Sequence, residues 1–405
     1  MRILFLTSEL PYPPYAGAPL RNFGLIEGLT GHEVWLLSFA SPYSQKAEQT
    51  PLRDLCARIE VIPQPQRTIL NRLQTLLLTR QADITRRYLS TAYARRLQDW
   101  LSGQAFDVIQ IENLEMAVYL PLIRSLQPDT PVIYDAHNAE YALQQRIYET
   151  ERATPTQTLS ALYSYVQARR IREFERQTCQ AADYLIAVSH TDAELLQRLD
   201  ITTPIKVVPN GISTRLYETP VQDPVDLEET ALVFTGKMDY RPNIDAALWF
   251  AEEILPLVRE EIPDAHFYVV GQSPHSRLDV LRGKPGITLT GLVPAVVPYL
   301  QAASVFVVPL RMGSGTRLKV LQAMAAGCPI VSTRAGAEGL SVVDGQEMIL
   351  ADTAKEFARA VVRLQKERDK AAEMGARARQ FVKDHYDWSV LLPCLLEVYR
   401  ELGVV

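Results

Sequence analysis

The stretch at residues 305–333, VFVVPLRMGSGTRLKVLQAMAAGCPIVST, has the pattern of a strand, a glycine turn, a helix and a second strand. Its first apolar run ends at Pro309, and its second begins after Gly327. Strands and helices that alternate in this way are typical of a parallel α/β sheet. A glycine turn leading into a helix also suits an anion, because the first helical turn has N–H groups without intrahelical partners and carries partial positive charge.

Two basic residues make this anion site more specific. Arg317 and Lys319 stand directly after the turn at 313–316, whose glycines leave the backbone open to a close ligand. We expect this segment to bind a diphosphate. An ordinary α/β turn that binds no ligand is the alternative, and the stretch alone leaves both open.

Length and composition set the frame for the rest of the chain. The 405 residues favour two domains of about 150 to 200 residues each. Hydrophobic residues at 47% and charged residues at 22% are ordinary for a globular protein with two cores. The net charge of −5 gives no general attraction to nucleic acid, so we expect no nucleic-acid partner.

The cysteines and the apolar segments bear on compartment and membrane insertion. Cys56, Cys179, Cys328 and Cys394 lie far apart, without metal-ligand spacing or a disulfide framework, and we interpret them as reduced residues of a cytoplasmic protein. The apolar run at the N-terminus is too short for a signal peptide. Residues 285–310 carry no charge over a length that could span a bilayer, but their prolines predict a strand, a short helix and a strand instead.

Apolar strands alternate with helical stretches along both halves. The expected strands of a first, mostly parallel sheet are residues 2–7, 32–39, 59–63, 106–111, 131–134, 184–188 and 206–208. Those of the second half are residues 231–235, 266–270, 287–290, 305–309, 329–332 and 348–350. A proline-rich, acidic stretch at 218–230 has no periodicity and is the expected linker.

Loops after parallel strands indicate where a ligand would bind, because the carboxyl ends of such strands form the ligand side of a doubly wound sheet. Gly17 follows the first strand, His137 follows the strand at 131–134, and Lys237 follows the strand at 231–235. We expect Gly17 and His137 on one wall of a cleft and Lys237 on the other, with the segment at 313–319. A plain surface loop at Gly17 and a structural histidine are the alternatives.

Residues 64–100 are unusually basic. They hold the arginines Arg67, Arg72, Arg80, Arg86, Arg87, Arg95 and Arg96, against only two aspartates, interleaved with leucines. Basic, leucine-bearing helices suit an anionic membrane surface or a phosphorylated lipid. Two solvated helices packed normally on the sheet are the alternative, and the sequence leaves both open.

Taken together, these motifs resemble the GT-B-fold retaining glycosyltransferases of family four, also known as glycosyl transferases group 1. The resemblance is carried by Gly17, the segment 135–138, Ser189, the segment 209–212 and, above all, residues 313–332. It implies two Rossmann-like domains facing across a cleft. The N-terminal domain would be residues 1–205, completed by a last helix at 388–405 that crosses back, and the C-terminal domain would be residues 206–387.

The resemblance also implies the chemistry. A nucleoside diphosphate sugar would bind the C-terminal domain and pass its sugar, with retention and without a metal ion or other cofactor, to a glycan or lipid-linked acceptor. His137, Arg317 and Lys319 would be the catalytic residues. The donor-binding residues would be Gly17, Lys237, Asn243, Gly313, Ser314, Gly315, Thr316 and Gln322.

This sequence departs from the family pattern at three positions. Ser314 and Gln322 stand where members commonly carry glutamates for the donor sugar and the ribose, and Asn243 lies near the usual position of a second lysine. A loop of the Gly-Ser-Gly-Thr-Arg-Leu-Lys type resembles one branch of the family, whereas Gln322 weakens the expected grip on ribose. We expect a transferase of surface polysaccharide or glycolipid synthesis. The alternatives are an impaired nucleotide-sugar-binding protein and a GT-B sugar-nucleotide epimerase.

Overall fold

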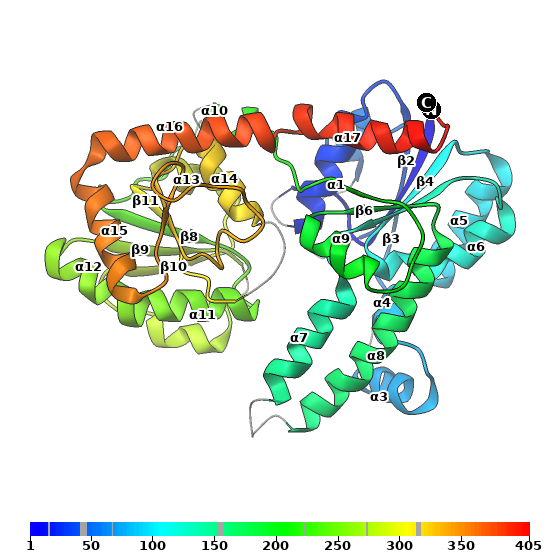
Figure 1. Cartoon of the computed structure of the whole chain (residues 1–405), viewed down its shortest axis with the longest axis horizontal. Coiled ribbons are helices and arrows are strands. Elements are labelled where there is room, and N and C mark those ends of the chain that lie inside the picture. The colour runs from blue at the N-terminus through cyan, green and yellow to red at the C-terminus, as the bar shows by residue number, and fades with distance from the viewer. Residues whose placement is uncertain are drawn as a thin grey trace. The chain divides into compact units, whose positions relative to one another are not determined.

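The computed structural model of the chain describes residues 1–14, 17–40, 47–66, 68–152, 158–219, 221, 223–272, 274–312 and 317–405 (Figure 1). The chain forms two compact units. Unit 1 comprises Met1–Pro209 together with Leu392–Val405, and unit 2 comprises Asn210–Leu391. Each unit has its own parallel sheet with helices on both faces.

The sheet of unit 1 has seven strands in the order β3-β2-β1-β4-β5-β6-β7, all parallel. These are β1 (Arg2–Thr7), β2 (Glu33–Phe39), β3 (Arg58–Ile62), β4 (Val108–Glu112), β5 (Val132–Ala136), β6 (Tyr184–Ala187) and β7 (Ile205–Val207). Every predicted strand is present, with ends that differ by at most two residues. Phe106, for example, is buried just before β4 begins, so its apolar character extended the predicted strand.

Helices on both faces bury this sheet. They are α1 (Gly17–Gly28), α2 (Leu52–Leu55), α3 (Ile69–Leu78), α4 (Ile84–Arg87), α5 (Thr91–Gly103), α6 (Leu120–Leu126), α7 (Glu140–Arg152), α8 (Thr158–Ala181) and α9 (His190–Gln197), with 3-10 turns η1 (Ala47–Gln49) and η2 (Leu114–Tyr119). In Figure 1, α7 and α8 pack side by side and extend away from the sheet, with α3 next to them. The α3 part of the basic stretch at 64–100 therefore lies on an outer part of unit 1, whereas α5 of the same stretch has a buried face.

The sheet of unit 2 has six parallel strands in the order β10-β9-β8-β11-β12-β13. They are β8 (Ala231–Thr235), β9 (His266–Val270), β10 (Ile287–Gly291), β11 (Val305–Val308), β12 (Ile330–Ser332) and β13 (Ile349–Leu350). The helices are α10 (Arg215–Glu218), α11 (Arg241–Trp249), α12 (Leu255–Glu261), α13 (Val297–Ala302), α14 (Leu318–Ala326), α15 (Ala354–Lys366) and α16 (Arg368–His385), with shorter turns η4 (Phe250–Ile254) and η5 (Ser276–Leu281).

Two sequence predictions for this half have clear outcomes. The uncharged stretch at 285–310 folds as β10, α13 and β11, as predicted, and every helix of the described residues is too short or too polar to cross a bilayer. The stretch at 218–230 is not a linker between the units, because both of its ends belong to unit 2. Gln301 fastens its first part, since the side chain donates to Tyr217 O and Thr219 O and accepts from Val221 N.

The last helix, α17 (Trp388–Glu401), begins in unit 2 and continues in unit 1. Its later residues Leu395, Val398 and Tyr399 are fully buried. A β-carbon at Gly28 of α1 would lie 1.9 Å from Leu392 Cδ1, so the two helices approach closely only because residue 28 has no side chain. The predicted domain boundary at 205/206 falls inside β7, which pairs with β6 as a whole and ends within unit 1.

Candidate functional site

His137 lies directly after β5, at the carboxyl edge of the sheet of unit 1. Its Nε2 is 2.8 Å from Oε2 of Glu112, the last residue of the neighbouring strand β4. The parallel register sets Glu112 opposite Asp135, which brings the two carboxylates and the imidazole to one edge. His137 has 10% of its side chain exposed and Glu112 has none. Glu112 was not predicted from the sequence, although Glu112 is the last residue of the buried strand β4.

Arg21 of α1 holds the second carboxylate of this cluster. Its Nε and Nη2 donate to both oxygens of Asp135 at 2.9 to 3.1 Å, and its Nη1 donates to Val208 O and Pro209 O. Both side chains are almost completely buried. A buried charge pair is stable only when its remaining hydrogen bonds are satisfied, and the two carbonyls meet that need. Arg21 thereby ties α1 to β5 and to the segment that leaves unit 1.

The same burial determines the charges of this cluster. Burial raises the pKa of Glu112 to about 7 and that of Asp135 to about 6, with Arg21 opposing both shifts. Burial lowers the pKa of His137 to about 4. His137 is therefore neutral near pH 7 and offers a hydrogen bond rather than a positive charge.

Glu112, Asp135 and His137 also meet one geometric condition for a metal site, since one ligand atom of each lies within 4.8 Å of the others. However, the guanidinium of Arg21 occupies both oxygens of Asp135, and it would repel a cation placed there. We therefore assign the cluster to a hydrogen-bonded ionic network.

Gly17, the other predicted residue of unit 1, is the first residue of α1 and is exposed. A β-carbon at this position would meet no atom of the described chain within 4 Å. The backbone is thus open to a ligand at this position, and the role of Gly17 in binding one stays a prediction.

Unit 2 brings together three predicted site residues, the catalytic Lys319 and the donor-binding Asn243 and Lys237. Lys319, in the first turn of α14, donates from Nζ to Asn243 Oδ1 at 2.7 Å and lies 4.3 Å from the centre of the Phe234 ring. Asn243 Nδ2 in turn donates to the backbone oxygen of Lys237 at 2.9 Å. A β-carbon on Gly236 would lie 2.7 Å from both Lys319 Nζ and Asn243 Nδ2, so this arrangement requires glycine there.

Arg317 and Lys319, at the start of α14, differ in whether a carboxylate lies near them. Arg317 is buried, with Nη2 donating to Ala335 O at 3.2 Å and lying 3.6 Å from the half-exposed Glu338 carboxylate. Among the described residues, no carboxylate pairs with Lys319. Burial, followed by repulsion from Arg317, lowers the pKa of Lys319 to about 7. An anionic ligand at this position would stabilise the protonated lysine.

The remaining predicted donor residues are placed differently. Gln322 is buried on α14, where its Nε2 donates to Tyr217 Oη at 3.0 Å, so one of its two amide hydrogens is used inside unit 2. The sequence analysis did not identify Tyr217, and no local signal pointed to it. Gly313, Ser314, Gly315 and Thr316 lie outside the described residues, and their proposed contacts with the donor stay predictions.

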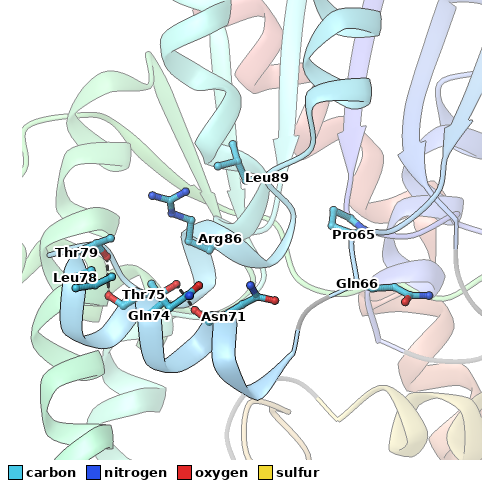
Figure 2. A pocket seen from close by; sticks show the side chains of 9 residues that line it. All are labelled: Pro65, Gln66, Asn71, Gln74, Thr75, Leu78, Thr79, Arg86 and Leu89. Atoms are coloured by element: carbon cyan, nitrogen blue, oxygen red, sulfur yellow. Dashed lines mark hydrogen bonds between the residues drawn. The ribbon is translucent and has the colours of Figure 1, made fainter.

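A pocket of about 550 Å³ lies within the basic region of unit 1 (Figure 2). Its lining residues are Pro65, Gln66, Asn71, Gln74, Thr75, Leu78, Thr79, Arg86 and Leu89. Pro65 and Gln66 follow the end of β3, so the pocket belongs to the carboxyl side of the sheet. In Figure 2, Arg86 lies between the polar face of α3 and Leu89.

The surroundings of this pocket combine features of both interpretations of residues 64–100. Arg170 of α8 donates to Thr75 O, Leu76 O and Gln81 O, which fastens the end of α3 to unit 1. Leu78, the last residue of α3, is 79% exposed, and Leu89, between α4 and α5, is 46% exposed, so two apolar side chains face solvent at the pocket. Outside the described part of the chain lie Arg67 and the side chains of Ile69, Leu70, Arg72, Leu73 and Leu77.

Comparison with known proteins identifies the class of this fold. Residues 29–216 match the sequence model described as Glycosyltransferase Family 4, and residues 229–367 match the one described as Glycosyl transferases group 1. Anabaena Alr3699/HepE, solved in complex with UDP-glucose, has a TM-score of 0.65 at 14% identity, with 99% of this chain and 100% of that chain covered.

Full-length relatives support the same class. The "Uncharacterized 44.6 kDa protein in cps region" of Klebsiella pneumoniae is 20% identical over 403 residues, which are 95% of this chain and 96% of the relative. The phosphatidyl-myo-inositol mannosyltransferase of Mycolicibacterium smegmatis is 23% identical over 383 residues, which are 92% and 86%. The chain carries a family 4 domain followed by a group 1 domain and is a glycosyltransferase of the GT-B type.

Proposed function

We propose that this glycosyltransferase transfers a hexosyl group from a nucleoside diphosphate sugar to a glycan or lipid-linked acceptor. The transfer retains the configuration at the anomeric carbon and uses no metal ion. The product belongs to a surface polysaccharide or glycolipid, and the enzyme works in the cytoplasm, at the inner membrane face.

The group around Lys319 carries this proposal. The ammonium of Lys319 donates to Asn243 and lies beside Gly236 and Lys237, which follow the carboxyl end of β8. Arg317 adds a second cation. Two cations near the amino end of α14, without a carboxylate on Lys319 among the described residues, suit a doubly charged diphosphate. The solved HepE complex with UDP-glucose and the named mannosyltransferase relative agree with a sugar-nucleotide donor.

The proposed chemistry needs no enzyme nucleophile. The bond between the anomeric carbon and the diphosphate breaks, and the acceptor oxygen bonds to the same face of that carbon. The acceptor's proton passes to the leaving diphosphate oxygen. The protein contributes by positioning the reactants and by stabilising the charge on the diphosphate through Arg317 and Lys319. His137, which is neutral, contributes a hydrogen bond to a sugar hydroxyl.

Calorimetry with the double variant Arg317→Ala/Lys319→Ala tests the donor site. We expect binding of UDP-glucose or GDP-mannose, whichever the unaltered protein binds, to weaken by about 100-fold or more, since two charge-assisted contacts are lost. The matched control is Arg363→Ala/Lys366→Ala, which removes two exposed cations of α15 that pair only with surface carboxylates. Equal affinities of the two double variants would refute the diphosphate assignment.

Gln322 favours one alternative, a protein that binds a sugar nucleotide without turnover. Its amide nitrogen uses one of its two hydrogens on Tyr217, so the contact with ribose would fall to the amide oxygen and the remaining N–H. Release of nucleoside diphosphate only in the presence of an acceptor extract would support the transferase. Binding without any such release would support the binding protein, and consumption of the donor without an acceptor would indicate an epimerase.

We also propose that the acceptor, or the membrane that carries it, contacts unit 1 at the pocket of Figure 2. The exposed Leu78 and Leu89 suit acyl or prenyl chains, and Arg86 with the side-chain amides suits an anionic headgroup. Arg86 donates from Nε to Gln81 at 2.6 Å, which holds its guanidinium in place.

Vesicle sedimentation at low salt tests this surface. We expect binding to vesicles containing phosphatidylglycerol, weaker binding at high salt, and no binding to phosphatidylcholine alone. Leu78→Ser with Arg86→Gln should reduce the bound fraction several-fold. Leu292→Ser is the control, because Leu292 is a 63% exposed leucine of unit 2. If the unaltered protein does not sediment with anionic vesicles, the proposed membrane contact is wrong.

A further inference from the structure

The imidazole of His137 has two nitrogens, and which of them carries the proton decides what the residue offers a substrate. Nε2 faces Glu112 Oε2 at 2.8 Å. The described residues provide no hydrogen-bond partner for Nδ1, on the other side of the ring. The protonation of Glu112 therefore sets the tautomer.

Among the described residues, the two amide side chains that contact Glu112 both present hydrogen-bond donors to it. Gln110 Nε2 donates to Oε1 at 2.7 Å. With the amide of Asn22 oriented so that its nitrogen meets the surrounding acceptors, Nδ2 donates to Oε2 at 2.8 Å and to Ala18 O at 3.3 Å. A carboxylate accepts from both of these donors and from Nε2–H of His137, whereas a protonated Oε2 would donate to an unprotonated Nε2. The positive charge of Arg21 favours the carboxylate.

The orientation of Gln110 is set from outside this cluster. Tyr399 of α17 donates from Oη to Gln110 Oε1 at 2.8 Å, which turns the amide nitrogen toward Glu112. Tyr399 and Gln110 are both fully buried, so neither group exchanges this bond for one with water. Tyr399 thus donates to Gln110, and Gln110 donates to Glu112.

We propose that Glu112 is a positioning residue that holds His137 in the Nε2–H tautomer and so reserves Nδ1 to accept a hydrogen bond from a hydroxyl of the sugar substrate. The identity of that hydroxyl rests on the proposed function. The tautomer itself rests only on the contacts of unit 1.

The neighbouring charges are compatible with this state. Arg21 and Asp135 face the pair from α1 and β5, Glu115 lies on η2, and Tyr399 lies on α17. The positive charge of Arg21 favours the carboxylate form of Glu112 and disfavours an imidazolium. The pKa of Glu112 is about 7, so a measurement at pH 8 examines the ionised form.

Nitrogen NMR of the full-length, ligand-free protein with labelled histidine tests the tautomer. The chain has six histidines, and His137→Asn identifies the signal of interest by its loss. At pH 8 we expect a protonated, pyrrole-type shift for Nε2 and an unprotonated, pyridine-type shift for Nδ1. A protonated Nδ1, alone or in an imidazolium, would overturn the proposal. This measurement needs neither a sugar-nucleotide donor nor a variant of Glu112.

The isosteric variant Glu112→Gln tests the role of the carboxylate. The amide nitrogen that this variant places at position 112 must face at least one of three donors, which are the amide nitrogens of Gln110 and Asn22 and Nε2–H of His137. We therefore expect a measurable population of the Nδ1–H tautomer of His137 and a loss of about tenfold or more in kcat/KM. Glu115→Gln is the control, since Glu115 acts on His137 through charge only and should leave the tautomer unchanged. A single Nε2–H tautomer in folded Glu112→Gln would also overturn the proposal. Absence of any transfer activity in the unaltered protein would instead count against the proposed function.

Discussion

Lys319 places its ammonium group between the side-chain oxygen of Asn243 and the ring of Phe234, and next to Arg317. Its pKa is lowered to about 7, so at pH 8 most molecules hold a neutral amine. A bound diphosphate favours the protonated form and raises the pKa again. Binding of the ligand and binding of a proton are therefore linked at this residue.

We predict that the protein takes up as much as about one proton per site, at Lys319, when it binds a nucleoside diphosphate at pH 8. The uptake should disappear near pH 6, where Lys319 is already protonated in the free protein. Calorimetry in two buffers with different ionisation enthalpies measures it. Lys319→Arg should still bind the ligand, without proton uptake, because arginine is charged throughout this range. Binding by the unaltered protein without proton exchange at pH 8 would contradict the prediction.

Helix α7 determines how firmly the segment with His137 is held, because its first turn follows that segment directly. Glu175 of α8 accepts hydrogen bonds from Glu140 N at 3.0 Å and Tyr141 N at 2.8 Å. Asp192 of α9 accepts from Ala139 N at 3.1 Å. Two other helices thus satisfy the N–H groups that the first turn of α7 leaves without intrahelical partners.

We predict that Glu175→Ala lowers the free energy of unfolding of unit 1 by about 2 to 4 kcal/mol, since two partly buried N–H groups lose their acceptor. Glu173→Ala, on the same helix, should cost at most about 0.5 kcal/mol, because its pair with Arg176 is on the surface. Urea denaturation, with hydrogen exchange of the α7 amides, measures both. Equal effects of the two variants would show that Glu175 does not cap α7.

At the scale of the whole molecule, α17 makes the end of the chain part of the first unit. Leu395 and Val398 are buried in unit 1, and Lys206 of β7 pairs with Glu397 and Glu401. Unit 1 is therefore incomplete without residues 392–405.

We predict that a chain ending at Leu391 has a protease-sensitive unit 1 and a unit 2 that remains resistant. The truncation exposes the apolar surface that covers Leu395 and Val398, and it removes the hydroxyl that Tyr399 gives to Gln110. Limited proteolysis with mass spectrometry identifies the resistant fragment. A chain ending at Glu401 is the control, and equal resistance of unit 1 in both chains would contradict the prediction.

The sequence by itself determined the strands of both sheets and indicated part of the candidate site. Period and composition identified β1, β8 and β9 with correct bounds, and Gly327 ends α14 in the left-handed conformation. The rule that ligands bind after parallel strands directed attention to His137 and Lys237. These features follow from short-range patterns, which are present in the order of the residues.

Only the tertiary structure decided which side chains meet. Glu112 reaches His137 because β4 and β5 are neighbours in register, and Asn243 reaches Lys319 because α11 and α14 both begin at the carboxyl side of one sheet. Gln322, expected to face the donor's ribose, bonds Tyr217 inside unit 2. Such contacts join residues far apart in the chain, so they depend on strand order and helix packing, which local sequence patterns do not encode.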